Sequence, residues 1–209
     1  MCKKVDGFPN VSSRSIYKYL NGVENTSVAL VEEKYSIFNW EEIWKNISFN
    51  LINSYDRTTI YKYIHEILPN RYRLYNIKKI PSPNCNHCDR EENNMHMLYF
   101  CNEIRDLVNW FRKLLMLCLG STNLSMIKLL LYDTTAMNRK KKNTVSILVT
   151  NYICTVWNNR DNPGDKLFLL KKKIIQQHNT SQFVLKEKMA KMFTDVYCNT
   201  NQRFLDNID

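Results

Sequence analysis

The chain has 209 residues, enough for one domain of generous size or two small ones. Hydrophobic residues make up 44% of it, which is enough to bury a core, so a wholly disordered chain is excluded. Lysine and arginine (30) exceed aspartate and glutamate (20), and the formal charge of +10 favours a polyanionic partner such as nucleic acid. The alternative is a soluble protein that is basic for other reasons, because charge alone does not name a partner.

Glycine and proline are scarce, at four and five residues. Barrels and sandwiches need many turn residues, so we expect an all-α protein with long helices and short connections. The seven cysteines are an odd number with one tight cluster, which favours a reducing compartment over a secreted disulfide scaffold. The N-terminus lacks the apolar run of a signal peptide, and no stretch has the roughly 18 apolar residues of a membrane span. We therefore expect an intracellular protein, nuclear or cytoplasmic, without a membrane segment.

Apolar residues at helical spacing predict helices along most of the chain. The longest continuous stripe begins near Asn94 and ends before Gly120, a residue typical of helix C-termini. The basic, aromatic segment 70–80 is expected to run extended because Pro81 disfavours helical backbone before it. In chain order, helices are expected over about 13–20, 41–52, 56–68, 94–119, 124–132, 145–157, 165–178 and 183–198.

The expected organisation has three regions. A polar leader covers residues 1–12, and a helical region with the cysteine motif covers 13–119. A C-terminal helical region covers 120–209, and it can share one core with the first. No fixed-period repeat and no low-complexity tract divides the chain further.

One motif carries specific chemistry: residues 85–101 have the spacing C-x2-C-x7-H-x4-C. Cys85 and Cys88 can form a knuckle that offers two sulfurs to one ion, and His96 and Cys101 can supply two further ligands from the first turns of the long helix. Zinc accepts this mixture of thiolate and imidazole in tetrahedral geometry. Four protein ligands leave no open position, so the sequence predicts a single structural zinc ion at the start of the longest helix.

Alternatives to this ligand set remain at the sequence level. His87 lies inside the knuckle and can replace His96, or the cysteines can simply pack in the core. A redox CxxC is disfavoured because it needs a strand before it and a helix directly after it, and Pro83 and Asn84 supply neither. The other cysteines are isolated: Cys2, Cys118, Cys154 and Cys198.

The motif and its flanks resemble the reverse-transcriptase zinc-binding domain near the C-terminus of non-LTR (LINE-type) retrotransposon polyproteins. The resemblance spans residues 15–161, and its specific part is the zinc core, in which Cys85, Cys88, His96 and Cys101 match the family's ligands. The residues that carry it are Ser15–Leu20, Trp40–Trp44, Tyr63–Pro69, Arg71–Leu74, Met95–Leu98, Phe100 and Val156–Asp161, with Asp161 where asparagine is usual.

This resemblance implies a role. In that family the region follows the polymerase, so this chain is expected to help hold template RNA or target DNA during target-primed reverse transcription. The chain contains no adjacent pair of aspartates for two-metal polymerisation, and residues 163–166 do not match the nuclease motif of related elements. We therefore expect a non-enzymatic module.

Two groups of residues are candidates for nucleic-acid contacts. In the first group, cations can meet phosphates while a tyrosine ring stacks on an unpaired base. The second group is a basic run, for which a solvated helix face or a nuclear-import signal is the alternative. The first group is Arg71, Arg73, Tyr75, Lys78 and Lys79, and the second is Arg139, Lys140, Lys141 and Lys142. The residues expected to pack in the core include Tyr61, His65, Trp40, Trp44, Trp110 and Trp157.

The leading functional hypothesis is binding of RNA or single-stranded DNA without sequence specificity. The rival hypotheses are a zinc-stabilised module that binds a partner protein, and a retroelement remnant without a selected function. Surface exposure separates the first two, because exposed tyrosines beside arginines favour nucleic acid whereas an exposed leucine or methionine patch favours a protein partner.

Overall fold

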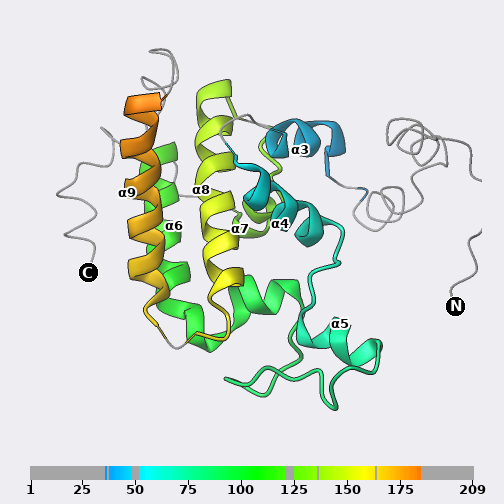
Figure 1. Cartoon of the computed structure of the whole chain (residues 1–209). Helices are drawn as coiled ribbons and strands as arrows, with labels where there is room; N and C mark the ends of the chain where they lie inside the picture. The colour runs from blue at the N-terminus through cyan, green and yellow to red at the C-terminus, as the bar shows by residue number, and fades with distance from the viewer. Residues whose placement is uncertain are drawn as a thin grey trace, which may run out of the picture. The chain divides into compact units, whose positions relative to one another are not determined.

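The structure is a computed structural model, and it describes residues 36, 38–48, 52–120, 125–135, 137–162 and 164–184. Its helices all belong to one compact unit that begins at Asn39 (Figure 1). The described residues form helices and one isolated β-bridge, without a strand, so the expected all-α class is confirmed for this part of the chain. The expected leader over 1–12, the helix over 13–20 and most of the helix over 183–198 lie outside the described residues.

Seven α-helices are described, with two irregular turns between α5 and α6. The turns are a π-helical turn, His96–Phe100, and a 3-10 turn, Asn102–Ile104. The α-helices are α3 (Trp40–Ile47), α4 (Ser54–Ile64), α5 (Arg71–Asn76), α6 (Arg105–Leu119), α7 (Met126–Leu130), α8 (Arg139–Asn158) and α9 (Lys166–Val184).

Asparagine side chains start four of these helices by accepting a backbone N–H from the first turn. This cap explains why the segment expected to be extended is helical: Asn70 Oδ1 accepts the Arg73 N–H at 2.9 Å and begins α5. Pro81 restricts only the residue before it, and α5 has ended by then. The four capping residues are Asn39, Asn53, Asn70 and Asn138.

Helix α8 is the centre of the described fold, with α3, α4, α6, α7 and α9 packed around it (Figure 1). Every residue from 144 to 156 is buried, so α8 is covered on all sides and not only along its apolar stripe. The polar side chains on the other sides have partners: Thr150 Oγ1 lies 2.8 Å from Tyr132 Oη, and Asn151 Nδ2 donates to Gln177 Oε1 at 2.8 Å.

The long helix expected over 94–119 is interrupted at Cys101, whose ψ of 135° is extended. The hydroxyl of Tyr152 on α8 donates to the Leu98 carbonyl at 2.6 Å, within the π-helical turn that precedes the break. Beyond the break α6 has 15 residues and ends at Gly120, in the left-handed conformation expected of a C-cap glycine. The longest described helix is α8, with 20 residues, so the cysteine motif does not stand at the start of the longest helix as predicted.

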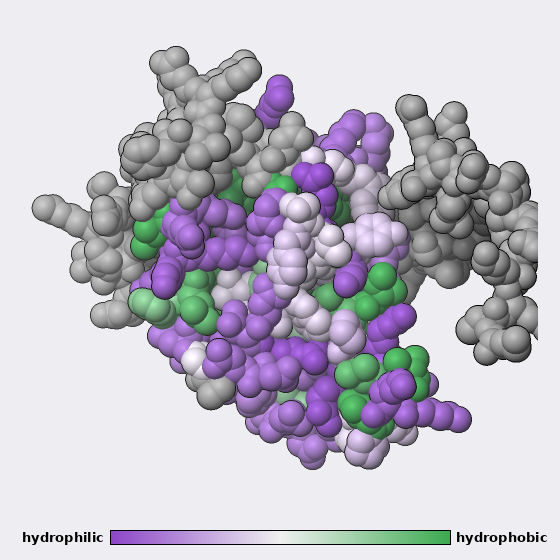
Figure 2. Space-filling model, in the orientation of Figure 1, coloured by the Kyte–Doolittle hydropathy of each residue, from purple (hydrophilic) through white to green (hydrophobic). Residues whose placement is uncertain are grey.

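The face shown in Figure 2 is largely hydrophilic, with small separate apolar patches. Among the described residues, no helix combines the length and the apolar character needed to cross a bilayer.

Candidate metal centre

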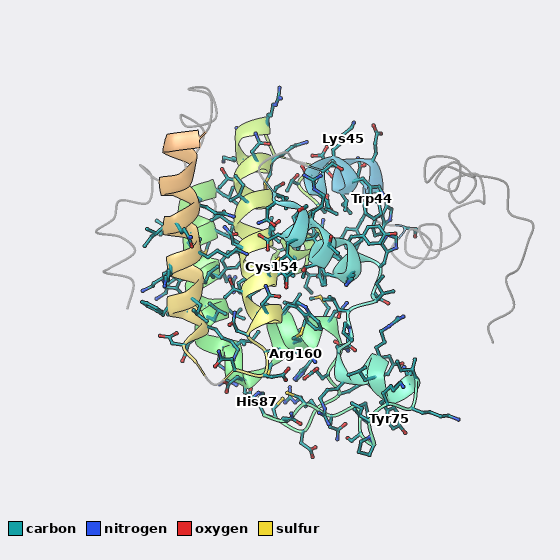
Figure 3. The ribbon with its side chains drawn as sticks, viewed as in Figure 1. Trp44, Lys45, Tyr75, His87, Cys154 and Arg160 are labelled. Carbon is teal, nitrogen blue, oxygen red and sulfur yellow. The ribbon has the colours of Figure 1, made fainter. Side chains whose placement is uncertain are left out.

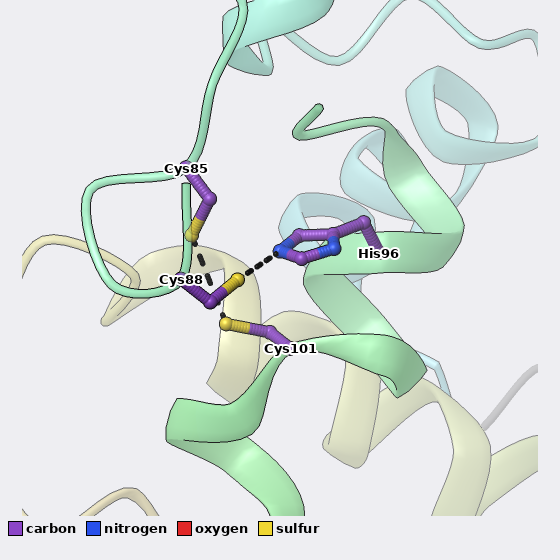
Figure 4. A group of neighbouring side chains, drawn as sticks. All are labelled: Cys85, Cys88, His96 and Cys101. Atoms are coloured by element: carbon purple, nitrogen blue, oxygen red, sulfur yellow. Dashed lines mark hydrogen bonds between the residues drawn. The ribbon is translucent and has the colours of Figure 1, made fainter. Parts of the chain in front are cut away.

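Four side chains converge (Figure 4) near His87 and Arg160, which lie at the C-terminal end of α8 (Figure 3). The ligand atoms of Cys85, Cys88, His96 and Cys101 all lie within 4.8 Å of one another. Cys85 Sγ lies 3.7 Å from Cys101 Sγ, and Cys88 Sγ lies 3.2 Å from His96 Nε2. This group can hold a metal ion.

The first two cysteines lie on a short loop that folds back on itself. An antiparallel bridge pairs Asn84 with Glu91, and the Cys85 N–H donates to the Arg90 carbonyl at 2.7 Å. Asp89 turns the loop with a φ of 53°, a left-handed conformation that aspartate tolerates better than most residues. The bridge therefore holds the two thiols on one side of the loop.

His96 and Cys101 come together because the helix between them is irregular. Residues five apart on a regular α-helix point about 140° away from each other, given 3.6 residues per turn. Here the Cys101 N–H donates to the His96 carbonyl at 2.8 Å, which closes a π-helical turn, and the chain then leaves the helix. The Asn93 side chain accepts the His96 N–H at 2.8 Å and starts this turn.

Burial sets the protonation of the free thiols. It raises the pKa of Cys101 to about 12 and raises the pKa of Cys85, because a charged sulfur is poorly solvated there. The pKa of Cys88 is lowered. Burial alone would raise this pKa, but hydrogen bonds from the backbone N–H groups of Arg90 and Asn102 and from the neighbouring thiols stabilise the thiolate and outweigh burial. Burial lowers the pKa of His96, which favours the neutral imidazole that binds metals.

His87, the alternative nitrogen ligand, is outside the four-residue group. Its backbone N–H donates to Cys85 Sγ at 3.4 Å, while its ring nitrogen Nδ1 lies 3.8 Å from the Glu103 carboxylate. His87 thus contributes to the knuckle through its backbone, and the structure brings His96 rather than His87 to the three thiols.

A second layer of charged residues, which the sequence analysis did not assign, borders the centre. Lys166 is only 7% exposed, and its ammonium lies 3.6 Å from the Glu103 carboxylate. Arg160 lies 4.5 Å from the centre of the Trp157 ring and donates to the Pro69 carbonyl at 2.8 Å. A small hollow beside the centre joins the loop to the α8–α9 connection, and its lining includes Lys166, Glu103 and Arg160 together with Cys85 and Cys101.

The first group of candidate nucleic-acid residues lies on α5 and the turn that follows it. Arg73, Tyr75, Lys78 and Lys79 are exposed, whereas Arg71 is half-buried and directs its guanidinium to the Ser82 carbonyl. A shallow hollow of about 540 Å³ opens beside this group. It is lined by Tyr75, Asn76, Lys78, Lys79, Ile80 and Pro81.

The second group begins α8, at the end far from the metal centre. The helix has 20 residues, which corresponds to about 30 Å at 1.5 Å per residue, so the two groups are not one surface. Lys141 donates to the Leu119 carbonyl, and Lys142 forms an ion pair with Glu42 at 2.6 Å. Arg139 is exposed, and the side chain of Lys140 lies outside the described part. Lys141 and Lys142 are therefore engaged within the fold.

Comparison of the chain with models of protein families, with curated proteins and with solved structures finds no match. The resemblance to the reverse-transcriptase zinc-binding domain therefore stays a prediction.

Proposed function

We propose that this chain is a zinc-stabilised module that binds RNA or single-stranded DNA, in the role of the tail of a non-LTR retrotransposon reverse transcriptase. The observation that carries the proposal is an exposed basic and aromatic surface that is hydrogen-bonded to the loop of the metal centre. We call it the α5 surface and define it as Tyr72, Arg73, Tyr75, Lys78 and Lys79.

Zinc suits the donor set of the centre. Two sulfurs that each lie about 2.3 Å from a tetrahedral zinc ion are separated by about 3.8 Å, and Cys85 and Cys101 are 3.7 Å apart. Three thiols and one imidazole would fill all four positions, so the proposal gives the metal a structural role and assigns no reaction to it. Lys166, near the centre, would help to offset the negative charge of three thiolates on one dication.

The α5 surface has the chemistry that single-stranded nucleic acid requires. Tyr72 and Tyr75 are 42% and 45% exposed, so their rings are available for stacking on bases. Lys78 and Lys79 are exposed and form no ion pair with another described residue. At the lower right of Figure 2, over this part of the molecule, an apolar patch lies among strongly hydrophilic side chains.

Glu92 connects the α5 surface to the metal loop. Its carboxylate accepts the Arg71 N–H at 3.0 Å, and its carbonyl accepts the Tyr72 N–H at 3.1 Å. Its own N–H donates to the Pro83 carbonyl at 2.9 Å, just before the first cysteine. No residue of α5 is buried, so these bonds are a large part of what holds the helix in place. The metal would therefore position the surface by ordering the loop.

The kind of apolar residue exposed favours nucleic acid over a partner protein. A protein-binding patch would present leucine and methionine side chains, whereas most of the exposed large apolar side chains in the described part are aromatic. The exposed aromatic residues are Tyr55, Tyr61, Tyr72, Tyr75, Phe100 and Phe168, and the exposed aliphatic ones are Ile67, Ile77, Leu117 and Ile127.

The test is a titration of the zinc-loaded chain with single-stranded RNA, single-stranded DNA and duplex DNA at several salt concentrations. Three phosphate contacts, from Arg73, Lys78 and Lys79, predict a slope of log K against log salt of about −2 for a single strand. Tyr75→Ala should weaken binding about tenfold. Tyr55→Ala is the matched control, because Tyr55 is 66% exposed but lies on α4.

A second pair of variants tests the link to the metal loop. Glu92→Ala should keep its zinc yet bind the strand several-fold more weakly, because the first turn of α5 loses its carboxylate acceptor. Glu91→Ala removes the same charge from an exposed neighbour and should bind normally. Weak binding that is equal for all polyanions and unchanged in every variant would contradict the proposal, and would leave the protein-interaction or remnant hypotheses.

A further inference from the structure

We propose that the hollow beside α5 is a pocket for one unpaired base, an adenine, and that the side chain of Asn76 recognises the edge of this base. We call the hollow the base pocket. It is lined by Tyr75, Asn76, Lys78, Lys79, Ile80 and Pro81. The inference rests on the proposed function and deepens it, because it names the base that the strand presents and adds a residue, Asn76, that the sequence analysis did not assign.

The base pocket has room for a single base. Its volume of about 540 Å³ falls within the roughly 300–1,000 Å³ of small-ligand sites, which is ample for one purine. A base can enter such a hollow only after it has left its own stack and its pairing partner. The pocket would therefore select unpaired strands over duplexes.

Tyr75 supplies a ring on which the base can stack. Its side chain is exposed, and its hydroxyl has no hydrogen-bond partner among the described residues. Figure 3 shows Tyr75 on α5, at the edge of the described helical unit. Ile80 and Pro81 add apolar surface to the lining, so the faces of a base would meet apolar groups while its edge stays available for hydrogen bonds.

The carboxamide of Asn76 is available to recognise that edge. Asn76 is the last residue of α5, it is exposed, and its side chain makes no hydrogen bond with another described residue. The asparagine at the other end of the same helix is occupied, because Asn70 Oδ1 accepts the Arg73 N–H at 2.9 Å. The sixth residue of α5 thus presents a donor and an acceptor that the fold itself does not use.

The donor and acceptor of a carboxamide match adenine. Adenine carries an N6–H donor beside the N7 acceptor, so an asparagine side chain can form two hydrogen bonds with it. Guanine carries two acceptors, O6 and N7, on the same edge, and each pyrimidine carries one hydrogen-bonding group there. A purine also covers more of the Tyr75 ring than a pyrimidine does. Hydrogen bonding and stacking therefore favour the same base.

The charges of the lining suit the backbone on either side of the bound base. Lys78 and Lys79 are the charged residues of the lining, which contains no carboxylate. Their ammonium groups would meet the two adjacent phosphates while the base occupies the pocket. The lysines would then supply affinity for any strand, and Asn76 would supply the preference for one base.

The chain that forms the pocket is fixed by backbone hydrogen bonds at the end of α5. The Lys78 N–H donates to the Tyr75 carbonyl at 2.8 Å, and the Lys79 N–H donates to the Leu74 carbonyl at 2.9 Å. Lys78 has a φ of 57°, the left-handed conformation that glycine usually adopts at this position after a helix. A lysine in that place brings a cation to the pocket, which is thus arranged before a strand binds.

The experiment measures the affinity of the full, zinc-loaded chain for homopolymeric DNA strands of about 12 nucleotides. Asn76→Ala should bind oligodeoxyadenylate about tenfold more weakly than wild type, because both hydrogen bonds to the base are lost, and should bind oligothymidylate as wild type does. Asn109→Ala is the matched control. Asn109 is also exposed on a helix, α6, and its side chain also makes no hydrogen bond with a described residue.

A second probe tests the same contact from the side of the base. In this strand unsubstituted purine replaces adenine, so the N6 amino group is absent while both rings remain. Wild type should bind this strand about tenfold more weakly than oligodeoxyadenylate. Asn76→Ala should lose nothing further with it, because the carboxamide and the amino group act as a pair.

Unchanged binding of oligodeoxyadenylate by Asn76→Ala, while Tyr75→Ala still weakens every strand, would overturn this inference and keep the proposed function. Equal weakening of all strands by Asn76→Ala would also overturn it, because Asn76 would then contact the backbone and not a base. A loss confined to a strand of another base would overturn the assignment to adenine. No binding of any strand would overturn both the inference and the proposed function.

Discussion

Cys101, at the break before α6, and Cys118, on α6, allow the metal centre to be tested at a single side chain. Cys101 Sγ belongs to the four-atom group, whereas Cys118 is half-buried on α6 outside it. Loss of a residue in the outer layer of a metal site typically lowers affinity by about 10- to 100-fold, and loss of a ligand should lower it at least as much. Cys101→Ser should therefore bind zinc at least tenfold more weakly, as measured by competition with a chromophoric chelator.

Cys118→Ser is the control in that experiment, because it removes a thiol of the same chemistry from the same region. Burial raises the pKa of Cys118 to about 12, so its thiol is neutral and inert at ordinary pH. Equal zinc affinity in both variants, both close to wild type, would show that Cys101 is not a ligand.

Residue spacing was enough to predict the four members of the cluster, but not the residues that hold them. Local spacing indicates which donors can meet, because the knuckle is closed by local contacts within residues 84–91. The contacts of Lys166 with Glu103 and of Arg160 with Pro69 join segments far apart in the chain. They depend on where α8 ends and α9 begins in space, which no local sequence pattern predicts.

At the scale of elements, the π-helical turn is tied to the central helix by the hydroxyl of Tyr152. Tyr152→Phe would leave the buried Leu98 carbonyl without that donor, which should lower the free energy of unfolding by about 1–2 kcal/mol. Because the same turn places His96 and Cys101, the zinc affinity should fall as well. Chemical denaturation and chelator competition measure the two effects separately.

Tyr132→Phe separates a general loss of stability from a loss at the metal centre. Tyr132 is fully buried, like Tyr152, and its hydroxyl also has one partner, Thr150 Oγ1 at 2.8 Å. We expect a similar loss of stability and an unchanged zinc affinity. If the two variants affected zinc binding equally, the hydrogen bond to the Leu98 carbonyl would not be what positions the ligands.

Some helix boundaries and buried faces could be predicted from the sequence, and others could not. The start of α3, the Gly120 terminus and the apolar stripe of α8 follow from local rules for helices, whereas α4 begins two residues before its expected start, at the Asn53 cap. Burial of α8 on every side was not predictable from that stripe, because its remaining faces carry serine, threonine and asparagine residues that find partners only in the folded protein. Helix α5 differs from the expected extended segment because the Asn70 cap starts a helix that ends before the backbone restriction of Pro81 applies.

At the scale of the whole molecule, an ion pair joins α3 to the first turn of α8. The hydrogen bond from Lys142 holds the pKa of Glu42 below its ordinary value of 4.5, against the opposing effect of burial. A carboxylate that is more acidic in the folded state stabilises the fold above its unfolded pKa, and this stabilisation is lost as the pH falls through the lower folded pKa. Glu42→Gln should thus be less stable than wild type at pH 7, by about 1 kcal/mol or less.

The difference between wild type and Glu42→Gln should stay constant above about pH 5 and shrink below pH 4.5. Thermal unfolding from pH 7 to pH 3 measures it, and any release of metal by acid is common to both proteins and cancels. Glu41→Gln is the control, since the Glu41–Lys45 pair is 80% and 67% exposed and is screened by water. A difference that persisted unchanged at pH 3 would contradict the role of the ion pair.

After removal of the metal, we expect one part of the described fold to loosen while the other part stays ordered. Structural zinc contributes to folding free energy, and that contribution acts where the ligands are. The loop over residues 83–92 and helix α5 have few apolar contacts of their own, and α5 has no buried residue. The core around α8 is closed by apolar side chains such as Phe111, whose ring is stacked 4.3 Å from that of Tyr152.

Hydrogen exchange with and without a chelator tests this division. We expect amides of residues 71–77 and 83–92 to exchange faster once the metal is removed, while amides of residues 145–156 keep their protection, because local opening follows the distribution of buried contacts. Addition of zinc should restore the slow exchange, and with it the order of the α5 surface on which nucleic-acid binding is proposed to depend. Faster exchange throughout α8 would instead mean that metal and core form a single cooperative unit, and the metal would then not act on the α5 surface through the metal loop and Glu92 alone.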